Sequence, residues 1–474
     1  MERELWLLCA TLVASLLCYL NSTRRHRSRR RPPGPTPLPL IGNLLDLRDG
    51  NLHHALARLA RVHGPVMRLE LGLTTAVVVS TRGAAREAFT RHDRRLGARA
   101  VPDTARALGF SDRSTIWLPA SDPRWKTTRG VVTAHVFSSR SLENLTSANA
   151  PGRNLTVASA QGLREVIEEL VECVAKPNVS DLFPFLRPLD LQGWRRWAAV
   201  RFEKVFRILD DIIDHRLAET TDASSEGTRG DFLDALIDLL NQGKISRDSL
   251  TTVLFDVFAA GSDTMALTVA WAMAELLRNP STMAAARAEI EDALGGKETI
   301  QETDATSLPY LQAVVKEAMR LHPVAPLMLP YQATEDGVEI GGYAVPRGCT
   351  VIFNSWAIMR DPAAWERPDE FVPERWFLDG AVKMDFRGKE FEFVPFGSGR
   401  RLCPGLPLAE RLVPFILASL LHAFEWKLPN GMSAEQLHVS ERFTTANVMA
   451  VPLKAVPIVV TCSATNGAGS KDVV

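Results

Sequence analysis

Cys403 lies in the string PFGSGRRLCPG, which runs from Pro395 to Gly405 and precedes an apolar segment with helical periodicity. A cysteine on a glycine-rich loop that enters a helix meets backbone N–H groups and the positive end of that helix. Both lower the pKa of a thiol, so we expect a thiolate, which suits a soft metal. A lone cysteine is more often an inert core residue, which is our expectation for Cys173, Cys349 and Cys462.

The glycines and one arginine of this loop indicate a flat, acidic cofactor beside the cysteine. Gly397, Gly399 and Gly405 permit a close approach of the backbone to such a group. Arg401 lies two residues before the cysteine, where its guanidinium could pair with an acidic group on the cofactor.

The string FxxGxRxCxG, filled here by Phe396, Gly399, Arg401, Cys403 and Gly405, resembles the haem-binding loop of the cytochrome P-450 family. The resemblance extends over nearly the whole chain. It is to plant microsomal members, and within them to the geraniol hydroxylase-like group, whose grass members oxidise terpenoids. The resemblance implies haem b as the cofactor, with Cys403 as the axial thiolate ligand of the iron. It also implies the P-450 fold, which is mainly α with a minor β region.

Three charged residues match a structural motif of the same family. Glu317 and Arg320 fill the pattern ExxR, and Arg375 in FVPERW is its usual third member. By spacing alone, the first two would form an ordinary ion pair on a helix surface. The resemblance implies instead a buried network that locks the core beside the haem loop, so we assign all three a structural role.

The string AGSDT, from Ala260 to Thr264, resembles the oxygen-activation motif of the family. Gly261 weakens the helix where dioxygen must fit, and the Thr264 hydroxyl could bond back to a carbonyl. A buried acid and a hydroxyl there would relay protons to oxygen, so Asp263 and Thr264 are the predicted catalytic residues. The alternative is that Asp263 is a satisfied core carboxylate. Met265 departs from the family pattern, which has Thr or Ser there.

Trp125 and Arg129 fill the pattern WxxxR, which in the family reaches a haem propionate. Together with Arg401, Arg129 would supply two guanidinium groups for the propionates. Tyr331 stands where relatives often carry His or Arg for the same purpose, which is a second departure from the family pattern.

Hydrophobic periodicity predicts the elements that position these residues. A long helix is predicted from Ser246 to Asn279, and its internal Asp256 and Asp263 favour a buried helix of a soluble core over a membrane span. The other elements are predicted as helices at Arg201–Leu217 and Pro309–Leu321, strands at Val66–Ser80 and Val338–Asn354, and a polar loop at Thr220–Gly230.

The N-terminus predicts a membrane anchor. Leu5 to Leu20 is an uncharged apolar run, and the arginine cluster that follows it, from Arg24 to Arg31, stays cytosolic under the positive-inside rule. We expect an anchor at residues 1–22, a basic and proline-rich hinge at 23–43 and a haem-binding domain at 44–474. This arrangement predicts a single-pass protein of the endoplasmic reticulum membrane with its catalytic domain in the cytosol.

Composition excludes several other classes of protein. The chain has 474 residues, of which 46% are hydrophobic, so a mostly disordered protein is excluded. Lys and Arg number 55, as do Asp and Glu, so no overall positive field favours nucleic acid. The six cysteines form no CxxC pair, which argues for reduced thiols.

The resemblance implies hydroxylation of a lipophilic small molecule by a monooxygenase that uses O2 and NADPH. Electrons would arrive from NADPH through a membrane-bound cytochrome P-450 reductase, with a cytochrome b-type protein as an additional candidate donor. We expect the reductase to dock near Arg124, Lys126 and Arg400. The substrate, by analogy a mono- or diterpenoid, is expected to meet four segments with apolar side chains: Ala100–Ala120, Phe255–Ala259, Val324–Leu329 and Thr444–Val451.

One stretch departs from the family and leaves alternatives open. Relatives carry two further helices between Trp125 and Phe183, and the chain is expected to be shortened at about 140–180. In their place Asn144–Gly162 is polar and turn-forming, with too little apolar periodicity for those helices. Besides an active monooxygenase, the sequence therefore allows a haem-binding but catalytically defective or non-enzymatic form. A haem-thiolate isomerase or dehydratase is a further alternative, against which the Asp263–Thr264 pair argues.

Overall fold

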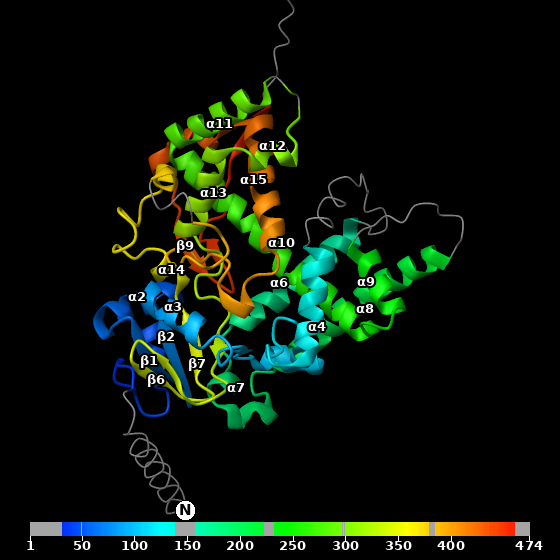
Figure 1. Cartoon of the computed structure of the whole chain (residues 1–474), viewed down its shortest axis with the longest axis vertical. Coiled ribbons are helices and arrows are strands. Elements are labelled where there is room, and N and C mark those ends of the chain that lie inside the picture. The colour runs from blue at the N-terminus through cyan, green and yellow to red at the C-terminus, as the bar shows by residue number, and fades with distance from the viewer. Residues whose placement is uncertain are drawn as a thin grey trace, which may run out of the picture.

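A computed structural model describes residues 31–459 of the chain, except 49, 138–156, 222–231, 296, 298 and 379–383. The fold is mainly helical with small sheets, as predicted (Figure 1). The predicted anchor and its arginine cluster up to residue 30 lie outside the described residues, as does most of the predicted loop at 220–230.

The α-helices of the described part are α2 (Leu52–His63), α3 (Arg82–Arg91), α4 (Pro123–Val131), α6 (Val157–Ala175), α7 (Val179–Leu182), α8 (Trp194–Thr221), α9 (Phe232–Asn241), α10 (Arg247–Arg278), α11 (Pro280–Leu294), α12 (Glu302–Thr306), α13 (Pro309–Leu321), α14 (Ser355–Ile358) and α15 (Leu406–Ala423). The strands are β1 (Val66–Leu71), β2 (Thr74–Val79), β3 (Ala98–Arg99), β4 (Tyr331–Gln332), β5 (Val338–Ile340), β6 (Tyr343–Val345), β7 (Thr350–Phe353), β8 (Phe424–Lys427), β9 (Glu441–Phe443), β10 (Asn447–Met449) and β11 (Val456–Val459).

The long helix α10 crosses the middle of the molecule and packs against α8, α13 and α15 (Figure 1). Ser246 caps its start, since the serine hydroxyl accepts the N–H of Ser249 at 3.2 Å. Pro280, the first residue of α11, follows its end. The prediction of a helix between Ser246 and Asn279 is confirmed. By length and composition alone, α10 and α15 are the two helices of the described part that could cross a membrane, yet they pack against each other.

The main sheet has five strands in the order β1-β2-β7-β4-β3. Its first two strands are antiparallel with Val66 opposite Val79, which confirms the strand pair predicted at Val66–Ser80. The hairpin β5–β6 turns at Gly341 and Gly342, both with positive φ, which favours glycine. The sheet and hairpin lie at one end of the molecule, away from the α11–α12 end (Figure 1).

Two sequence predictions about loops were partly wrong. Residues 157–162, predicted as part of a polar turn-forming stretch, begin helix α6, and Thr220 and Thr221, predicted as loop, end helix α8. Helices α6 and α8 pack against each other and bury residues such as Leu170 and Leu209. Tertiary burial therefore extends these helices into sequences whose own propensity is weak.

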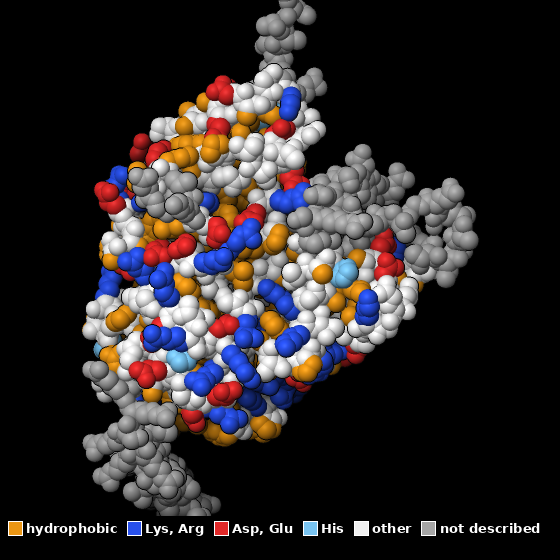
Figure 2. Space-filling model, viewed as in Figure 1, with side chains coloured by type: hydrophobic (Ala, Val, Ile, Leu, Met, Phe, Trp, Pro, Cys, Tyr) orange, Lys and Arg blue, Asp and Glu red, His pale blue; other side chains and the backbone are white. Residues whose placement is uncertain are grey.

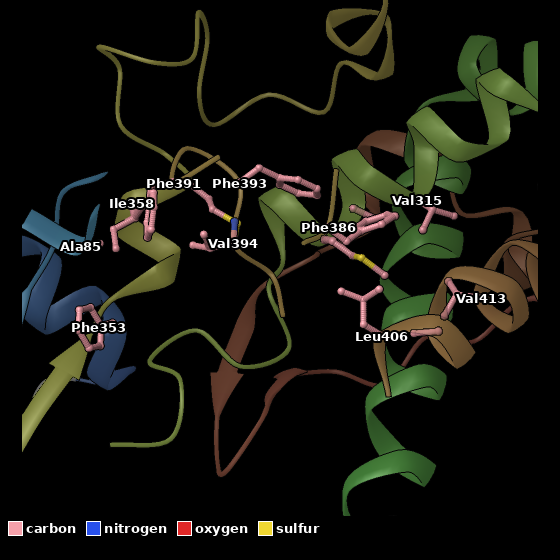
Figure 3. Packing of buried hydrophobic residues seen from close by; sticks show 14 of the residues in the cluster. Ala85, Val315, Phe353, Ile358, Phe386, Phe391, Phe393, Val394, Leu406 and Val413 are labelled. Atoms are coloured by element: carbon pink, nitrogen blue, oxygen red, sulfur yellow. The ribbon is translucent and has the colours of Figure 1, made fainter. Parts of the chain in front are cut away.

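The main core joins elements that are far apart in the sequence. Figure 3 shows its side chains from α3, β7, α13, α14, α15 and the stretch between Phe386 and Val394. Leu406 and Val413 of α15 belong to this core, together with Val315 of α13. The start of α15 is therefore fixed by packing immediately after the cysteine loop.

A buried charge network fastens α13 to the chain that follows it. Arg320 donates to both carboxylate oxygens of Glu317 at 2.9 Å, and Arg375 donates to Glu317 Oε1 at 2.9 Å. The backbone N–H of Val372 and the indole N–H of Trp376 complete the set around the same carboxylate, each at 3.0 Å. All of the carboxylate's neighbours are donors, so the network is fully satisfied and acts as a structural lock.

Replacing Glu317 with Ala should destabilise the protein by about 3 to 5 kcal/mol, because two buried guanidinium groups lose their counter-charge. Urea unfolding of the purified protein would measure the change. The control is Arg91→Ala, which removes an exposed ion pair to Glu87 at 3.1 Å and should cost less than about 1 kcal/mol. Equal costs for the two variants would contradict the structural role of the network.

Candidate active site

The cysteine loop folds back on itself before α15 begins. The backbone N–H of Cys403 donates to the carbonyl of Phe396 at 3.0 Å, and a short 3-10 helix at Gly399–Arg401 lies between them. Gly405 is the N-cap of α15. Cys403 therefore stands at the N-terminal end of a buried helix, as the sequence predicts.

The surroundings of Cys403 shift its pKa in opposite directions. Burial raises the pKa of this thiol, whereas the backbone N–H groups of Gly405 and Leu406 and the positive charge of Arg129 lower it. The expected effect of loop and helix is present, but burial outweighs it in the protein chain alone. A bound metal cation reverses this balance, because a coordinating thiol is deprotonated outright.

Contacts within the protein chain itself explain why position 399 is a glycine. Its φ of +66° favours glycine, and a Cβ at this position would collide with the carboxylate of Asp93. The Asp93 carboxylate accepts the backbone N–H of Arg400 at 3.0 Å, and it forms an ion pair with the Arg400 guanidinium at 2.9 Å. A close approach at Gly399 is therefore made to Asp93, whereas a Cβ on Gly405 would make ordinary contacts with Cys403 Sγ and Phe137 Cζ, both at 3.8 Å.

Arg401 is buried and bonded to backbone carbonyls of two loops. Its guanidinium donates to Gly97 O at 2.8 and 3.1 Å, to Thr115 O at 3.2 Å and to Leu118 O. It also lies over the ring of Trp125, with 4.9 Å from the guanidinium carbon to the ring centroid. The Trp125 indole N–H itself donates to Thr115 O at 3.1 Å. The structure therefore brings Trp125 and Arg401 together beside the cysteine loop.

Arg129 and a residue that the sequence analysis missed complete a cluster of positive charge, in which Arg401 and the missed residue are buried and Arg129 is half-buried. Arg129 donates to Leu402 O, in the residue before Cys403. Arg99, on β3, donates to Leu329 O and lies over the ring of Tyr331 at 4.2 Å. Only the pairing of β3 with β4 reveals Arg99, because no motif surrounds it in the sequence.

This cluster fits the acidic groups of a haem. Burial, and then repulsion by Arg99 and Arg129, lowers the pKa of Arg401 to about 9. Burial also lowers the pKa of Arg129, with Cys403 opposing and Arg99 adding to the effect. No Asp or Glu in the described part of the chain forms an ion pair with any of the three guanidinium groups. A carboxylate-bearing cofactor held by Cys403 would supply the missing negative charge.

The two predicted catalytic residues lie on α10 in different surroundings. Thr264 Oγ1 donates to the carbonyl of Ala260 at 2.8 Å, the back-bond expected from the sequence, and its side chain is exposed. Asp263 is half-buried, and burial followed by Glu168 raises its pKa while Arg164 lowers it. Asp263 therefore interacts electrostatically with α6 and is neither a fully buried acid nor a satisfied core carboxylate. Helix α10 continues through Gly261 without a break.

The four segments expected to meet substrate are joined by the fold in two pairs. The backbone N–H of Asn447 donates to Val324 O at 2.8 Å, which ties two of them together. Phe110 contacts Phe255 of α10 edge to face at 5.0 Å, which ties the other two. Phe202 and Phe206 of α8 complete this aromatic cluster and were not predicted from the sequence.

The residues expected at the reductase surface are polar and solvent-accessible. Arg124 pairs with Asp122 at 2.7 Å and Arg400 with Asp93 at 2.9 Å, while Lys126 is exposed. Figure 2 shows Lys and Arg side chains over much of one face, interspersed with Asp and Glu. This mixture agrees with the zero formal charge of the chain.

Comparison with known proteins connects this geometry to one family. The cytochrome P450 family profile matches residues 32–152 and 151–448. Cytochrome P450 76M5 of Oryza sativa subsp. japonica is 62% identical over 97% of this chain and 99% of that protein. Ent-cassadiene C11-alpha-hydroxylase 1 of the same organism is 55% identical over 97% and 99%, respectively. Geraniol 8-hydroxylase of Swertia mussotii is 37% identical over 91% of this chain and 94% of its own length.

A zebrafish cytochrome P450 solved with progesterone supports the fold, with a TM-score of 0.69 at 23% identity over 87% of this chain and 99% of that one. The family profile covers well over half of the chain, and relatives match it along nearly their whole length. The chain therefore belongs to the cytochrome P450 family and is a haem-thiolate monooxygenase of that family.

Proposed function

We propose that this monooxygenase hydroxylates a terpenoid in plant specialised metabolism, with electrons from NADPH delivered by a membrane-bound reductase. The observation that carries the proposal is the 55% identity, over 97% of the chain, to a protein named as an ent-cassadiene hydroxylase. The more distant geraniol 8-hydroxylase supports the same substrate class. Phe110, Phe202 and Phe255 are buried and pack on one another, so they would support an apolar wall beside such a substrate.

The protein's own contribution is to hold the cofactor and to keep the site at the membrane. Cys403 would hold the iron, and Arg99, Arg129 and Arg401 would hold the acidic groups of the haem. The haem, when bound, supplies the activation of dioxygen. The anchor at residues 1–22 would keep the site at the endoplasmic reticulum membrane, where lipophilic substrates partition.

Asp263 and Thr264 are proposed to deliver protons. The Thr264 hydroxyl is fixed by its bond to Ala260 O, so its own lone pairs remain available to a water molecule. The raised pKa of Asp263 places that carboxyl closer to neutral pH, which suits a group that gives and regains a proton. Consecutive residues of a helix point in different directions, so a proton that passes between the two would travel through water.

The substrate proposal is tested with microsomes that contain the full chain and a cytochrome P450 reductase. Incubation with NADPH and either geraniol or ent-cassadiene should yield a hydroxylated product, detected by mass spectrometry. Microsomes without NADPH are the control. Turnover of neither compound, in a preparation that gives the thiolate-type spectrum, would refute the terpenoid proposal.

Replacing Cys403 with Ala should abolish the thiolate-type Soret band of the reduced carbon monoxide complex, because the iron loses its sulfur ligand. The control variants are Cys173→Ala and Cys349→Ala, which remove buried free thiols elsewhere in the fold and should keep the band. An unchanged spectrum in Cys403→Ala would show that another group binds the iron.

Replacing Thr264 with Ala should retain haem but uncouple NADPH consumption from product formation. We expect the ratio of product to NADPH to fall about tenfold, because water partly replaces the lost hydroxyl. The matched control is Thr268→Ala, one turn further along α10, which loses an equivalent bond to Thr264 O at 2.8 Å. If both variants couple equally well, the relay role of Thr264 is wrong.

A second candidate is a haem-binding form with impaired turnover, and three observations favour it. The family profile matches in two parts that meet at residues 151–152, and the alignment with cytochrome P450 76M5 extends over 505 positions although this chain has 474 residues. In addition, an apolar groove of about 560 Å³ runs between α10 and α15, lined by residues that include Met265, Val269 and Leu420. A chain that lacks family helices would leave apolar surface of this kind uncovered.

Restoring the shortened segment separates the two candidates. Inserting the corresponding stretch of cytochrome P450 76M5 between Phe137 and Val157 should raise stability by about 2 kcal/mol or more, because it covers apolar side chains. A glycine-serine insert of equal length is the control. If the natural segment changes neither the unfolding midpoint nor the haem content, the shortened chain is complete as a fold and the second candidate fails.

A further inference from the structure

Asp256 is a buried carboxylate on α10 that no step proposed above uses. It lies two turns before Thr264 and next to Phe255 of the aromatic cluster. Ser114 Oγ donates to Asp256 Oδ1 at 2.7 Å, and the backbone N–H of Thr115 donates to Oδ2 at 2.7 Å. Both oxygens of one carboxylate are thus used to hold two consecutive residues of a loop.

The loop that Asp256 holds is the stretch Ser114–Leu118. On the side away from Asp256, this loop contacts Trp125 and Arg401 beside the cysteine loop. Thr115 O accepts from Trp125 at 3.1 Å and from Arg401 at 3.2 Å. Leu118 O accepts from Arg401 as well. The peptide groups of this stretch therefore connect α10 on one side to the arginine cluster beside Cys403 on the other.

Burying the Asp256 carboxylate costs free energy, which argues against an incidental contact. Burial raises the pKa of its carboxyl to about 7, in spite of the opposing bonds from Ser114 and from the backbone of Thr115 and Ile116. Ser114 is itself fully buried, and its hydroxyl also accepts the N–H of Ile116 at 3.1 Å. An apolar residue at 256 would avoid this desolvation cost but would leave the loop donors unpaired.

We propose that Asp256 is a positioning residue for substrate selection. By fixing Ser114 and Thr115 to α10, it determines the position of the loop that forms one wall of the substrate space. It also determines the position of the loop carbonyl groups that bind Arg401. The inference rests on the proposed terpenoid function only for the choice of probe substrates. A single carboxylate then determines how far the loop stands from α10, and with it the shape that a lipophilic molecule must fit.

The test compares Asp256→Ala with the conservative Asp256→Asn. Asparagine retains one oxygen for the Thr115 N–H, and its amide N–H groups could donate to the Ser114 hydroxyl, so it should restore most of the wild-type behaviour. Ser114→Ala removes one of the two bonds and should give an intermediate effect. The matched control is Asp248→Asn on the same helix, which weakens the link of α10 to Arg113 at 3.2 Å but is exposed.

Three readouts are measured on the haem-loaded full chain. In Asp256→Ala, hydrogen exchange of the peptide containing Thr115 and Ile116 should quicken about tenfold or more. The dissociation constant of 4-phenylimidazole, followed by its spectral shift, should change severalfold, and the product ratio from geraniol or ent-cassadiene should broaden. Asp256→Asn and Asp248→Asn should remain close to wild type in all three.

The inference is overturned if Asp256→Ala lowers only haem content or thermal stability, while exchange at 114–118, ligand affinity and product ratio of the folded fraction match wild type. It is also overturned if Asp248→Asn has the same effect as Asp256→Ala. Failure of the terpenoid proposal is distinguishable, because wild type would then oxidise neither substrate while exchange and 4-phenylimidazole binding still report on the loop.

Discussion

The arginine side chains beside Cys403 bring positive charge into the protein, and the surrounding structure has to stabilise that charge. Arg99, Arg129 and Arg401 come from three different elements, and burial, followed by repulsion from the other two guanidinium groups, lowers the pKa of Arg401. Burying unpaired charge is costly, and in the chain itself the cost is offset by backbone carbonyls that accept the guanidinium N–H groups. Those carbonyls belong to loops, so the site depends on whatever holds the loops still.

Helix α10 holds one of these loops. Asp256 fastens the loop at 114–118 to α10. Further along the same helix, the indole N–H of Trp271 donates at 3.0 Å to Asn447 O, which lies within a predicted substrate segment. On the other side of the core, Glu317 fixes α13 to the chain around Arg375. Rigid helices thus carry the loops that meet cofactor and substrate, an arrangement that limits the entropy cost of ordering them.

Sequence motifs and hydrophobic periodicity predicted much of the fold and of the candidate site. The cysteine loop is a contiguous string, so its position before α15 follows from local sequence. The ends of α10 and α13 follow from Ser246, Pro280, Pro309 and the residues before Pro323, because caps and prolines act within one helical turn. Arg99 was not predicted as a site residue because no motif surrounds it, and Ser114 was predicted only as part of the substrate segment Ala100–Ala120. The start of α6 was missed because its sequence has low apolar content.

The sequence was therefore sufficient to predict the family, the thiol proposed to bind iron, the charged residues of the core lock and the main helices. Only the tertiary structure decided that Arg99 joins Arg129 and Arg401, that Gly399 makes room for Asp93, and that Asp256 holds the loop beside them. The net pKa of Cys403 was decided there too, because burial outweighs the helix and loop effects that the local sequence encodes. The reason is physical: burial and charge repulsion depend on which distant segments meet, and no local pattern records that.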